Sequence, residues 1–302
     1  MKKLFLTALI LVCSYTAFAQ QDAQYTQYMY NTMGVNPAYA GNRGVMSIVG
    51  LHRSQWVGLD GAPTTQTLAV HTPFGESRLG LGVSFVNDAI GPTEEQYFNV
   101  DVSYTIPTSA DGKLSFGLKG AANILKFDHT KLTAVPDAEL QSFSQFSPNF
   151  GLGAYYHKGN KWYLGLSVPN ILETEHYDDA ALSKIGKERI NYYLTGGYVF
   201  DITDNIKLKP ATLFKYVAGA PLQADLSLNA MFNEKFVLGA AYRWSAAMSL
   251  MAGFQVNQQI FIGYGYDMDT TELSGFDSGS HEIILRFELL NSRRDLISPR
   301  FF

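Results

Sequence analysis

The chain has 302 residues, of which 14% are aromatic and only 17% are charged, whereas a soluble protein usually carries about 25% charged residues. Without Lys2 and Lys3, the remaining 21 basic and 27 acidic residues give a net charge of −6, which argues against a nucleic-acid partner. The single cysteine, Cys13, excludes a fold held together by disulfides.

Residues 1–19 have the pattern of a secretory signal peptide. The positively charged start Lys2-Lys3 is followed by the apolar run Leu4–Cys13 and by the small-x-small site Ala17-Phe18-Ala19. This run is too short for a membrane-spanning helix, which needs about 20 apolar residues. Val12 precedes the cysteine where a lipoprotein signal needs a small residue. The mature chain is therefore expected to begin near Gln20, without lipid and without cysteine.

Residues 20–44 form a second segment, which contains "QYMYNTMGVNPAYAGNRG" (Gln27–Gly44). Gly34, Pro37 and Gly41 disfavour a helix, and the alternation is too weak for a strand. The segment nevertheless has too many large apolar side chains for a disordered linker. These are Tyr28, Met29, Tyr30, Met33, Val35 and Tyr39. We therefore expect it to pack against the rest of the protein.

Residues 45–289 alternate between apolar and polar side chains, as β-strands with two different faces do. The clearest example is "QYFNVDVSYTIP", in which Phe98, Val100 and Val102 alternate with Asn99 and Asp101. The pattern predicts about fourteen strands, at 45–56, 65–72, 78–87, 97–106, 113–126, 148–157, 161–168, 190–200, 206–217, 222–232, 235–244, 247–256, 259–267 and 280–289.

The connections between these strands are short at every second position, and the long ones fall in the other set. The long connections are 88–96, 127–147, 169–189 and 268–279. This asymmetry is typical of outer-membrane barrels. The sequence therefore predicts an all-β protein, a transmembrane antiparallel β-barrel of about 14 strands in the outer membrane. Both termini are expected in the periplasm and the long loops outside the cell.

The two faces of the predicted strands differ in charge. One face is nearly free of charged residues, as contact with lipid requires. The other carries both signs, which can pair across a lumen: Asp101, Lys119, Lys207, Lys209, Asp225, Arg243, Glu282, Arg286 and Glu288.

Three local features qualify this pattern. Pro210 predicts a bulge or a local break, because proline cannot donate to the ladder. Near Gly50 the first strand loses its alternation, which leaves open whether His52, Arg53 or Gln55 faces inward. The strand glycines are interpreted as bends of the barrel: Gly117, Gly120, Gly151 and Gly153.

A fourteen-stranded barrel leaves a lumen that wall side chains do not fill. Residues 20–44 are expected to start in the periplasm beside the barrel mouth and to fold into this lumen as a plug. Irregular backbone at membrane depth needs such protected surroundings. The alternative is a belt across the periplasmic rim.

Signatures of catalysis and metal binding are weak. His52 and Ser54 lie two residues apart, but the sequence has no G-x-S-x-G motif. The acidic loop "ETEHYDDA" could ligate a divalent ion, yet it matches no loop with fixed ligand spacing. We therefore predict no enzymatic activity, no cofactor and no metal.

The last residues, 290–302, are expected to form a short periplasmic tail. It is basic through Arg293, Arg294 and Arg300, and it ends in Phe301-Phe302. Such a tail could lie near lipid headgroups or could serve as a docking strip for a periplasmic protein.

Three blocks of this sequence resemble the PorP/SprF family of outer-membrane proteins in the type IX secretion system of Bacteroidetes. The blocks are "QYTQYMYNTMGVNPAYAG" (Gln24–Gly41), "LHRSQWVGLDGAPTTQTLAVHTP" (Leu51–Pro73) and the terminal "SPRFF" (Ser298–Phe302). The resemblance implies a role in protein secretion or in surface attachment, including that of gliding adhesins.

The resemblance also implies the kinds of partner. These are a secreted surface protein or adhesin, other type IX secretion components, a peptidoglycan-associated lipoprotein and outer-membrane lipid. The family has no catalytic residues to carry over. Residues of the matching blocks and of the tail are the candidates for partner binding: Tyr28, Tyr30, Asn36, Pro37, Tyr39, His52, Arg53, Trp56, Arg293, Arg294 and Arg300.

Three functions therefore compete. The leading one is a non-enzymatic barrel that binds secreted cargo, or its C-terminal signal, and secretion partners. The second is a plugged 14-stranded transporter for small apolar solutes, which an apolar stripe in the lumen would favour. The third is an outer-membrane enzyme, which would need a serine, histidine and acid site that the sequence does not reveal.

Overall fold

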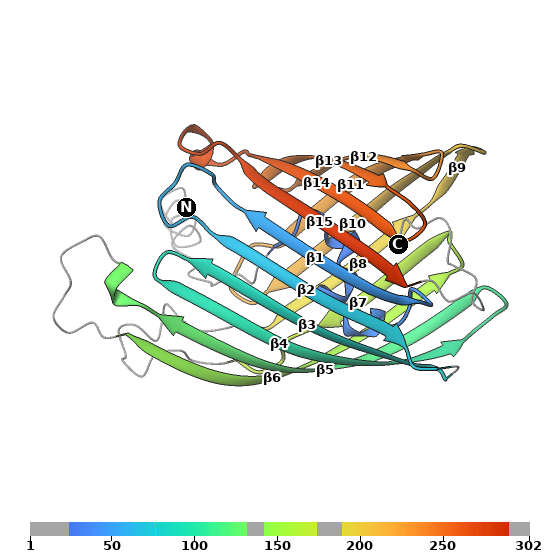
Figure 1. The fold of residues 1–302 in the computed structure, drawn as a ribbon, viewed down its shortest axis with the longest axis horizontal. Coiled ribbons are helices and arrows are strands. Elements are labelled where there is room, and N and C mark those ends of the chain that lie inside the picture. The colour runs from blue at the N-terminus through green and yellow to red at the C-terminus, as the bar shows by residue number, and fades with distance from the viewer. Residues whose placement is uncertain (1–23, 76, 132–141, 174–188, 290–302) are drawn as a thin grey trace, which may run out of the picture.

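The described residues of the computed structural model, 24–75, 77–131, 142–173 and 189–289, form a closed 14-stranded antiparallel β-barrel (Figure 1). β15 pairs with β1, and β10 pairs with β11 on one side and with β8 and then β9 on the other. β8 and β9 are therefore two halves of one strand, interrupted at Val199. The predicted signal peptide and tail lie outside the described residues.

The strands follow one another around the wall in chain order. They are β1 (Met46–Ser54), β2 (Thr64–Pro73), β3 (Leu79–Ile90), β4 (Thr93–Pro107), β5 (Gly112–Phe127), β6 (Phe143–Lys158), β7 (Trp162–Val168), β8 (Asn191–Tyr198), β9 (Phe200–Thr203), β10 (Ile206–Val217), β11 (Gln223–Phe232), β12 (Phe236–Arg243), β13 (Ala247–Gln255), β14 (Ile260–Asp269) and β15 (Ser280–Leu289).

The helical elements are all short. They are η1 (Tyr28–Tyr30), α2 (Thr32–Val35), η2 (Pro37–Tyr39), η3 (His129–Lys131) and η4 (Glu272–Gly275). None of the helices in the described residues is long and apolar enough to cross a membrane.

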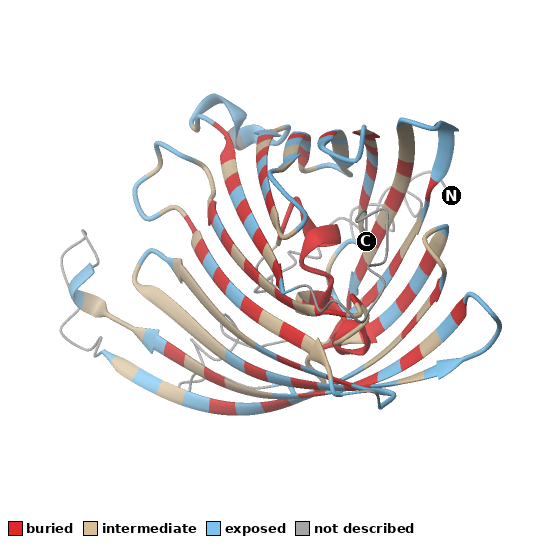
Figure 2. Ribbon diagram, turned by 45° about the vertical axis from the view of Figure 1, so that its right-hand side comes forward, coloured by how far each residue is buried: buried red, intermediate tan, exposed pale blue. Residues whose placement is uncertain are grey.

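Side chains alternate between the lumen and the outer surface along each strand, which Figure 2 shows as bands of buried and exposed residues. The predicted charged face is the inner one: Asp101, Lys209 and Glu282 are all fully buried. β1 keeps this alternation through Gly50, so Arg53 faces the lumen and His52 faces outward. The parity that the sequence left open is thus resolved.

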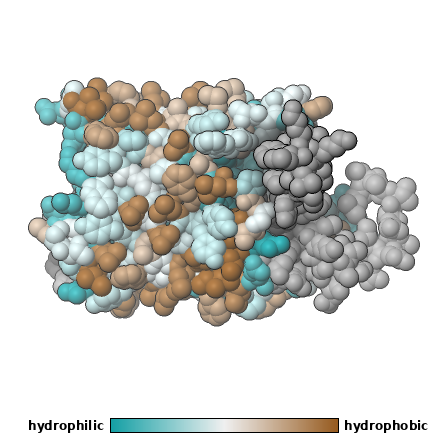
Figure 3. Space-filling model, turned by 180° about the vertical axis from the view of Figure 1, so that it is seen from behind, coloured by the Kyte–Doolittle hydropathy of each residue, from teal (hydrophilic) through white to brown (hydrophobic). Residues whose placement is uncertain are grey.

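The outer surface carries an apolar band between two rings of aromatic residues. Leucines such as Leu166, Leu228 and Leu250 are exposed in this band, and the view in Figure 3 shows mostly brown and pale residues there, with teal ones near the margins. One aromatic ring contains Tyr156, Trp162, Tyr198, Phe200, Phe236 and Phe254, and the other contains Tyr192, Tyr216, Tyr242, Trp244 and Tyr264. Paired aromatic girdles around an apolar band are typical of a membrane-spanning barrel.

The two ends of the barrel differ in their connections. The turn end carries the short turns 74–78, 108–111, 159–161, 204–205, 233–235 and 256–259, together with the start of β1 and the end of β15. The loop end carries the connections from β1 to β2, β5 to β6, β7 to β8 and β14 to β15.

One predicted long loop, 88–96, is wrong. β3 continues to Ile90 and β4 begins at Thr93, so only Gly91 and Pro92 connect them. Outward polar side chains form a ladder across these strand ends, with Asn87 donating to Gln66 at 3.2 Å and Gln96 donating to Asn87 at 3.2 Å. Residues 88–96 lack the alternation of a membrane strand because the outer face of this hairpin is polar, beyond the apolar band.

The bulge or break predicted at Pro210 is wrong for the strand that contains it. β10 is continuous past Pro210 and pairs with β11 in one register. The interruption falls at Val199 between β8 and β9, beside this position, and the Val199 amide donates instead to the Lys161 carbonyl at 2.7 Å. Proline has no N–H for the ladder, so the neighbouring strand loses a partner there.

Candidate functional site

Residues 24–44, here called the plug, lie inside the barrel (Figure 2). Met29 and Met33 are each 2% exposed and Ala38 is fully buried, so the segment is a plug and not a belt on the rim. The plug supplies part of the buried core together with inward residues of the wall, such as Tyr155 and Phe261.

The plug runs from the loop end to the turn end. Gln24 donates to Gln223, the first residue of β11, at 2.7 Å, and Gln223 lies at the loop end. The plug leaves at the turn end, where β1 begins at Met46. The segment was expected to start at the periplasmic mouth, on the same side as the end of the last strand. This expectation is wrong for Gln24, which lies at the loop end, whereas β15 ends with Leu289 at the turn end.

Inward-facing glycines of the wall accommodate the plug backbone. A Cβ added to Gly117 would overlap the Ala38 amide nitrogen, and one added to Gly153 would overlap the Asn36 side chain. A Cβ on Gly80 would likewise overlap the Ala40 carbonyl oxygen. Gly117 thus allows the close approach of the plug backbone and Gly153 that of the Asn36 side chain, roles that the interpretation as bends did not include. Gly120, on the outer surface, faces open space.

The loop-end anchor of the plug is a buried ion cluster around Arg53. Its guanidinium lies 2.7 Å from an Asp267 oxygen and 3.3 Å from a Glu282 oxygen, and it donates to the Thr26 hydroxyl at 2.8 Å. Glu282 also accepts the backbone amides of Thr26 and Gln27, at 2.9 and 2.8 Å. The plug backbone is therefore an integral part of this cluster, because it satisfies the acceptors that the arginine leaves free.

The middle of the plug is anchored by the Asn36-Pro37 step. The Asn36 amide donates to the Ala154 carbonyl at 3.0 Å, and its oxygen accepts the Ala38 amide at 3.0 Å and caps η2. Ser167 of β7 donates to the Val35 carbonyl at 2.7 Å. Proline at the first position of η2 has no amide hydrogen to satisfy, which suits the start of a helix.

The turn-end anchor is a second ion cluster. The Arg43 Nε donates to Glu288 Oε1 at 2.8 Å, and a second, short contact joins Arg43 Nη2 to the same oxygen. Arg286 Nε lies 3.5 Å from this carboxylate. On the way to this anchor, the Gly41 amide donates to His71 Nδ1 at 3.2 Å, and Ser103 donates to the Ala40 carbonyl at 2.6 Å.

Aromatic contacts complete the fit of the plug. The Tyr30 ring lies 4.8 Å from Phe261, with Lys209 and Arg286 over it at 5.9 and 5.8 Å. The Tyr39 ring meets Tyr155 edge-on at 5.3 Å.

The structure thus brings most of the predicted site residues together but covers them. Tyr28, Tyr30, Asn36, Pro37 and Tyr39 are all buried against the wall. Arg53 joins them, whereas His52 points away to the outer surface. The tail residues Arg293, Arg294 and Arg300 lie outside the described residues.

Trp56 lies apart from the plug, at the loop end. Its φ is 46°, which is unusual for a bulky residue. Its amide donates to Ser280 Oγ at 3.1 Å and its indole donates to Asp269 at 3.0 Å. These contacts hold the connection between β1 and β2 against the end of β14.

Four residues that hold the plug were not among the predicted site residues: Thr26, Gln27, Arg43 and Asp267. Asp267 continues the alternation of β14, and that alternation is a signal that could have placed it on the inner face. Arg43 follows "NPAYAG" after one intervening residue, Asn42, but no pattern within one segment identifies Glu288 as its partner.

The serine and histidine near the start of the chain form no catalytic constellation in this structure. His52 Nε2 lies 3.1 Å from Ser54 Oγ, but both are on the outer surface near the loop-end aromatic ring. Across the described ranges, no three His, Cys, Asp or Glu side chains are arranged to hold a metal ion.

Known structures share the barrel fold at low sequence identity. The Acinetobacter baumannii outer membrane protein Omp33 matches with 10% identity and a TM-score of 0.50, over 81% of this chain and 98% of that one. The CymD monoaromatic hydrocarbon channel matches with 13% identity and a TM-score of 0.50, over 87% and 92% of the two chains. The Ralstonia pickettii toluene transporter TbuX matches with 10% identity and a TM-score of 0.50, over 90% and 96%.

The sequence comparison identifies a family, which the shared fold alone does not. No curated protein matches the chain significantly. The profile of the family described as type IX secretion system membrane protein PorP/SprF matches residues 17–287, which is nearly the whole chain. This match agrees with the resemblance carried by the plug and the first hairpin, and with the plugged outer-membrane barrel seen here. The chain therefore belongs to the PorP/SprF family and is an outer-membrane β-barrel component of type IX secretion.

Proposed function

We propose that this barrel is a non-enzymatic binding component, which holds an adhesin-type secreted protein, or its C-terminal signal, together with periplasmic secretion partners. The observation that carries the proposal is the plug. An ordered segment fills the lumen from one end to the other and is anchored by ion clusters at both ends. A barrel closed in this way is suited to binding at its mouths more than to free diffusion through its centre.

The plug is held by polar contacts as well as by apolar packing. Glu282, Asp267 and Glu288 on the wall each bind plug atoms, and the tyrosines and methionines of the plug join the buried core of the wall. Polar interfaces of this kind resemble reversible contacts between domains. A partner that engaged the plug at one mouth could therefore change its position without unfolding the barrel.

The proposed topology places the turn end in the periplasm and the loop end outside the cell. Short periplasmic turns and longer extracellular loops are the rule for such barrels. Secretion partners, including a peptidoglycan-associated lipoprotein, would then meet the turn end, and cargo would meet the loop end near Trp56. The basic tail, 290–302, would follow β15 on the periplasmic side.

A plugged transporter for small apolar solutes is the second candidate. It is favoured by the likeness of the fold to barrels described as a hydrocarbon channel and a toluene transporter. It is disfavoured by the lumen wall, where Arg53, Lys209 and Glu282 are fully buried instead of an apolar stripe. We therefore rank it below the binding function.

The test is deletion of residues 24–40 in a host that lacks its own copy of this protein. We expect the barrel to remain inserted, because its strands close it without the plug, and surface display of the cognate secreted protein to fall. Co-purification of secretion components should fall with it. If both readouts stay at the wild-type level while the variant still resists unfolding in detergent, the plug is not part of the binding machinery.

A further inference from the structure

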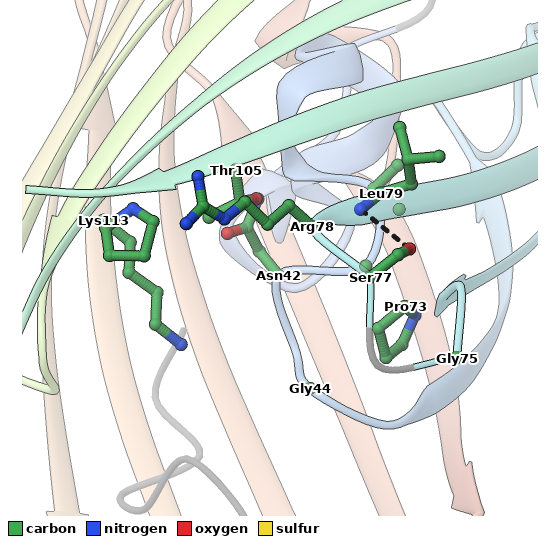
Figure 4. Close-up of a pocket in the computed structure, with 13 residues that line it drawn as sticks. Asn42, Gly44, Pro73, Gly75, Ser77, Arg78, Leu79, Thr105 and Lys113 are labelled. Carbon is green, nitrogen blue, oxygen red and sulfur yellow. Dashed lines mark hydrogen bonds between the residues drawn. The ribbon is translucent and has the colours of Figure 1, made fainter.

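A pocket of about 390 Å³ opens at the turn end, between the end of the plug and the wall (Figure 4). Ala40, Gly41, Asn42 and Gly44 of the plug form one side. The other side comes from the turn between β2 and β3, with Ser77 and Arg78, and from the adjoining ends of β4 and β5, with Thr105 and Lys113. Arg43, between the lining residues Asn42 and Gly44, binds Glu288 and is not itself among the lining residues.

Two cationic side chains of this pocket belong to the lumen-facing set. Arg78 is two residues before the inward Gly80, and Lys113 is two residues before the inward Ser115. Figure 4 shows Arg78 beside Thr105 and Asn42, with Lys113 on the same side of the pocket. They therefore line the mouth of the lumen, whereas Lys158, at the end of β6, is on the outward-facing set.

These cations differ from their neighbours in having no anionic partner among the described residues. At the same end of the barrel, Lys207 of β10 lies 3.2 Å from Glu234, and Lys161, between β6 and β7, is paired with Asp201. The described lining of the pocket contains no carboxylate. Glu76, which adjoins Ser77 in the sequence, is outside the described residues.

The other polar groups of the pocket are already engaged. Ser115 donates to the Asn42 side-chain oxygen at 3.2 Å and lies 2.8 Å from the Thr105 hydroxyl. The Ser77 hydroxyl donates to the Phe74 carbonyl at 2.5 Å. The free capacity is therefore that of the guanidinium and the ammonium, which are donors only. An acceptor with negative charge complements them, and the planar fork of an arginine matches a carboxylate.

We propose that this pocket binds a carboxylate of a partner polypeptide, either an acidic side chain or a chain end. Its volume falls within the roughly 300–1,000 Å³ of sites that enclose a small molecule or a peptide side chain. A lipid phosphate is disfavoured because the cations face the lumen mouth while the lipid contacts the outer wall. The inference rests on the proposed function, which brings a protein partner to this mouth.

Binding of that partner in the pocket would also depend on the position of the plug. Residues 40–44 form one wall of it, and within them Arg43 is tied to Glu288. A carboxylate held by Arg78 and Lys113 would contact the plug end directly. Displacement of the plug would remove one side of the pocket, so binding here favours the plugged state.

The test uses the full-length mature protein in nanodiscs of zwitterionic lipid. The probe is a short fluorescein-labelled peptide of alternating glycine and glutamate with a free C-terminal carboxylate, and the reference probe carries glutamine and a C-terminal amide. Fluorescence anisotropy should show the acidic peptide bound more tightly. Arg78→Gln with Lys113→Gln should raise its Kd about tenfold or more, which corresponds to ~1.4 kcal/mol.

The matched control is Lys158→Gln with Lys235→Gln, which removes the same charge from this end of the barrel but from outside the pocket. This control should leave the Kd within about twofold, since exposed charges beyond a Debye length of about 10 Å at 0.1 M salt are largely screened. Equal losses in both double variants, or equal binding of both peptides, would overturn the proposal. So would inorganic phosphate that binds in the same residue-dependent way while the acidic peptide does not.

This outcome is separable from the test of the proposed function. The pocket variants keep the plug and the barrel, whereas the deletion of residues 24–40 removes the plug. If peptide binding ignores Arg78 and Lys113 but the deletion still abolishes display, the pocket proposal falls and the proposed function stands. If peptide binding depends on both residues but the deletion changes nothing in cells, the pocket proposal stands and the proposed function falls.

Discussion

Arg53 shows how one residue joins the plug to the wall. It contacts Asp267, Glu282 and the Thr26 hydroxyl at the same time, and it is 2% exposed. Its neighbour on the same strand, His52, faces outward and lies 3.1 Å from the Ser54 hydroxyl. The two adjacent positions therefore provide a comparison in which strand, depth and distance from the loop end are the same and only the side of the wall differs.

Replacement of Arg53 by leucine should destabilise the protein. It removes the ion-pair partner of two buried carboxylates, Asp267 and Glu282, and breaking a buried ion pair on one side costs about 3–5 kcal/mol. We expect the folded, fast-migrating band to be lost at a clearly lower temperature when samples are heated in detergent before electrophoresis. His52→Leu is the control, and it should move this temperature little. Equal shifts for both variants would mean that the cluster does not stabilise the barrel.

Gly117 offers a second comparison at the residue scale. Its missing side chain leaves room for the plug at Ala38, whereas Gly120 faces open space on the outer wall. Overpacking of a filled interior costs about 1–3 kcal/mol, which we expect to displace the plug where it contacts Gly117. The prediction is that Gly117→Val loosens the plug and that Gly120→Val does not.

A cysteine introduced at Ala38 makes this prediction measurable, because the mature chain is expected to contain no other cysteine. Ala38 is fully buried, so Ala38→Cys should react slowly with a maleimide in the otherwise unchanged protein. The Gly117→Val background should raise the labelling rate at least about tenfold, the change that ~1.4 kcal/mol produces. Protection in both backgrounds would show that the wall tolerates the added side chain without moving the plug.

The plug acts as a unit at the scale of elements. η1, α2 and η2 are each too short to be stable alone, since isolated helices of fewer than about 12 residues are marginal in water. They are held by the wall at three places: Glu282 near the loop end, Ala154 and Ser167 in the middle, and Glu288 near the turn end. The strands, in contrast, pair continuously around the barrel without help from the plug.

Deletion of residues 24–40 should therefore open the lumen without unfolding the barrel. In planar bilayers we expect the wild-type protein to conduct weakly and the deletion variant to show larger single-channel steps. Persistence of heat-modifiable migration is the control for folding. Unchanged conductance in a folded variant would mean that other parts of the chain close the lumen.

The whole molecule is a membrane barrel with two unlike ends. An apolar outer band between two aromatic rings fixes its position along the membrane normal. The connections then distinguish the loop end from the turn end. Which end faces the outside of the cell follows from the rule on loop lengths and is open to a direct experiment.

Single cysteines can determine this orientation. Ser274→Cys lies in η4 at the loop end, and Ala110→Cys lies in the turn between β4 and β5. Both positions are exposed, so a maleimide that does not cross membranes should label Ser274→Cys on intact cells and Ala110→Cys only after the cells are broken. The opposite pattern would invert the proposed topology and would move the candidate carboxylate pocket to the cell surface.

Much of this architecture could be predicted from local patterns. Period-two alternation located strands such as β4 and β11. It does so because a wall between lipid and lumen imposes opposite chemistry on successive residues. The same pattern assigned the charged residues to the lumen. It failed at 88–96, where β3 and β4 extend beyond the lipid and both faces are polar. There the pattern that marks a strand in the membrane is absent although the strand continues.

The sequence by itself determined the strand rhythm, the chemistry of the two faces and the presence of an apolar segment that needed a place to pack. Only the tertiary structure decided where that segment lies and what holds it. Arg53 meets Asp267 and Glu282, and Arg43 meets Glu288, across more than 200 positions of the chain. Closure of the barrel brings β15 beside β1 and so creates these contacts. No periodicity within a strand encodes them, because periodicity specifies a side of the wall and not the partner across it.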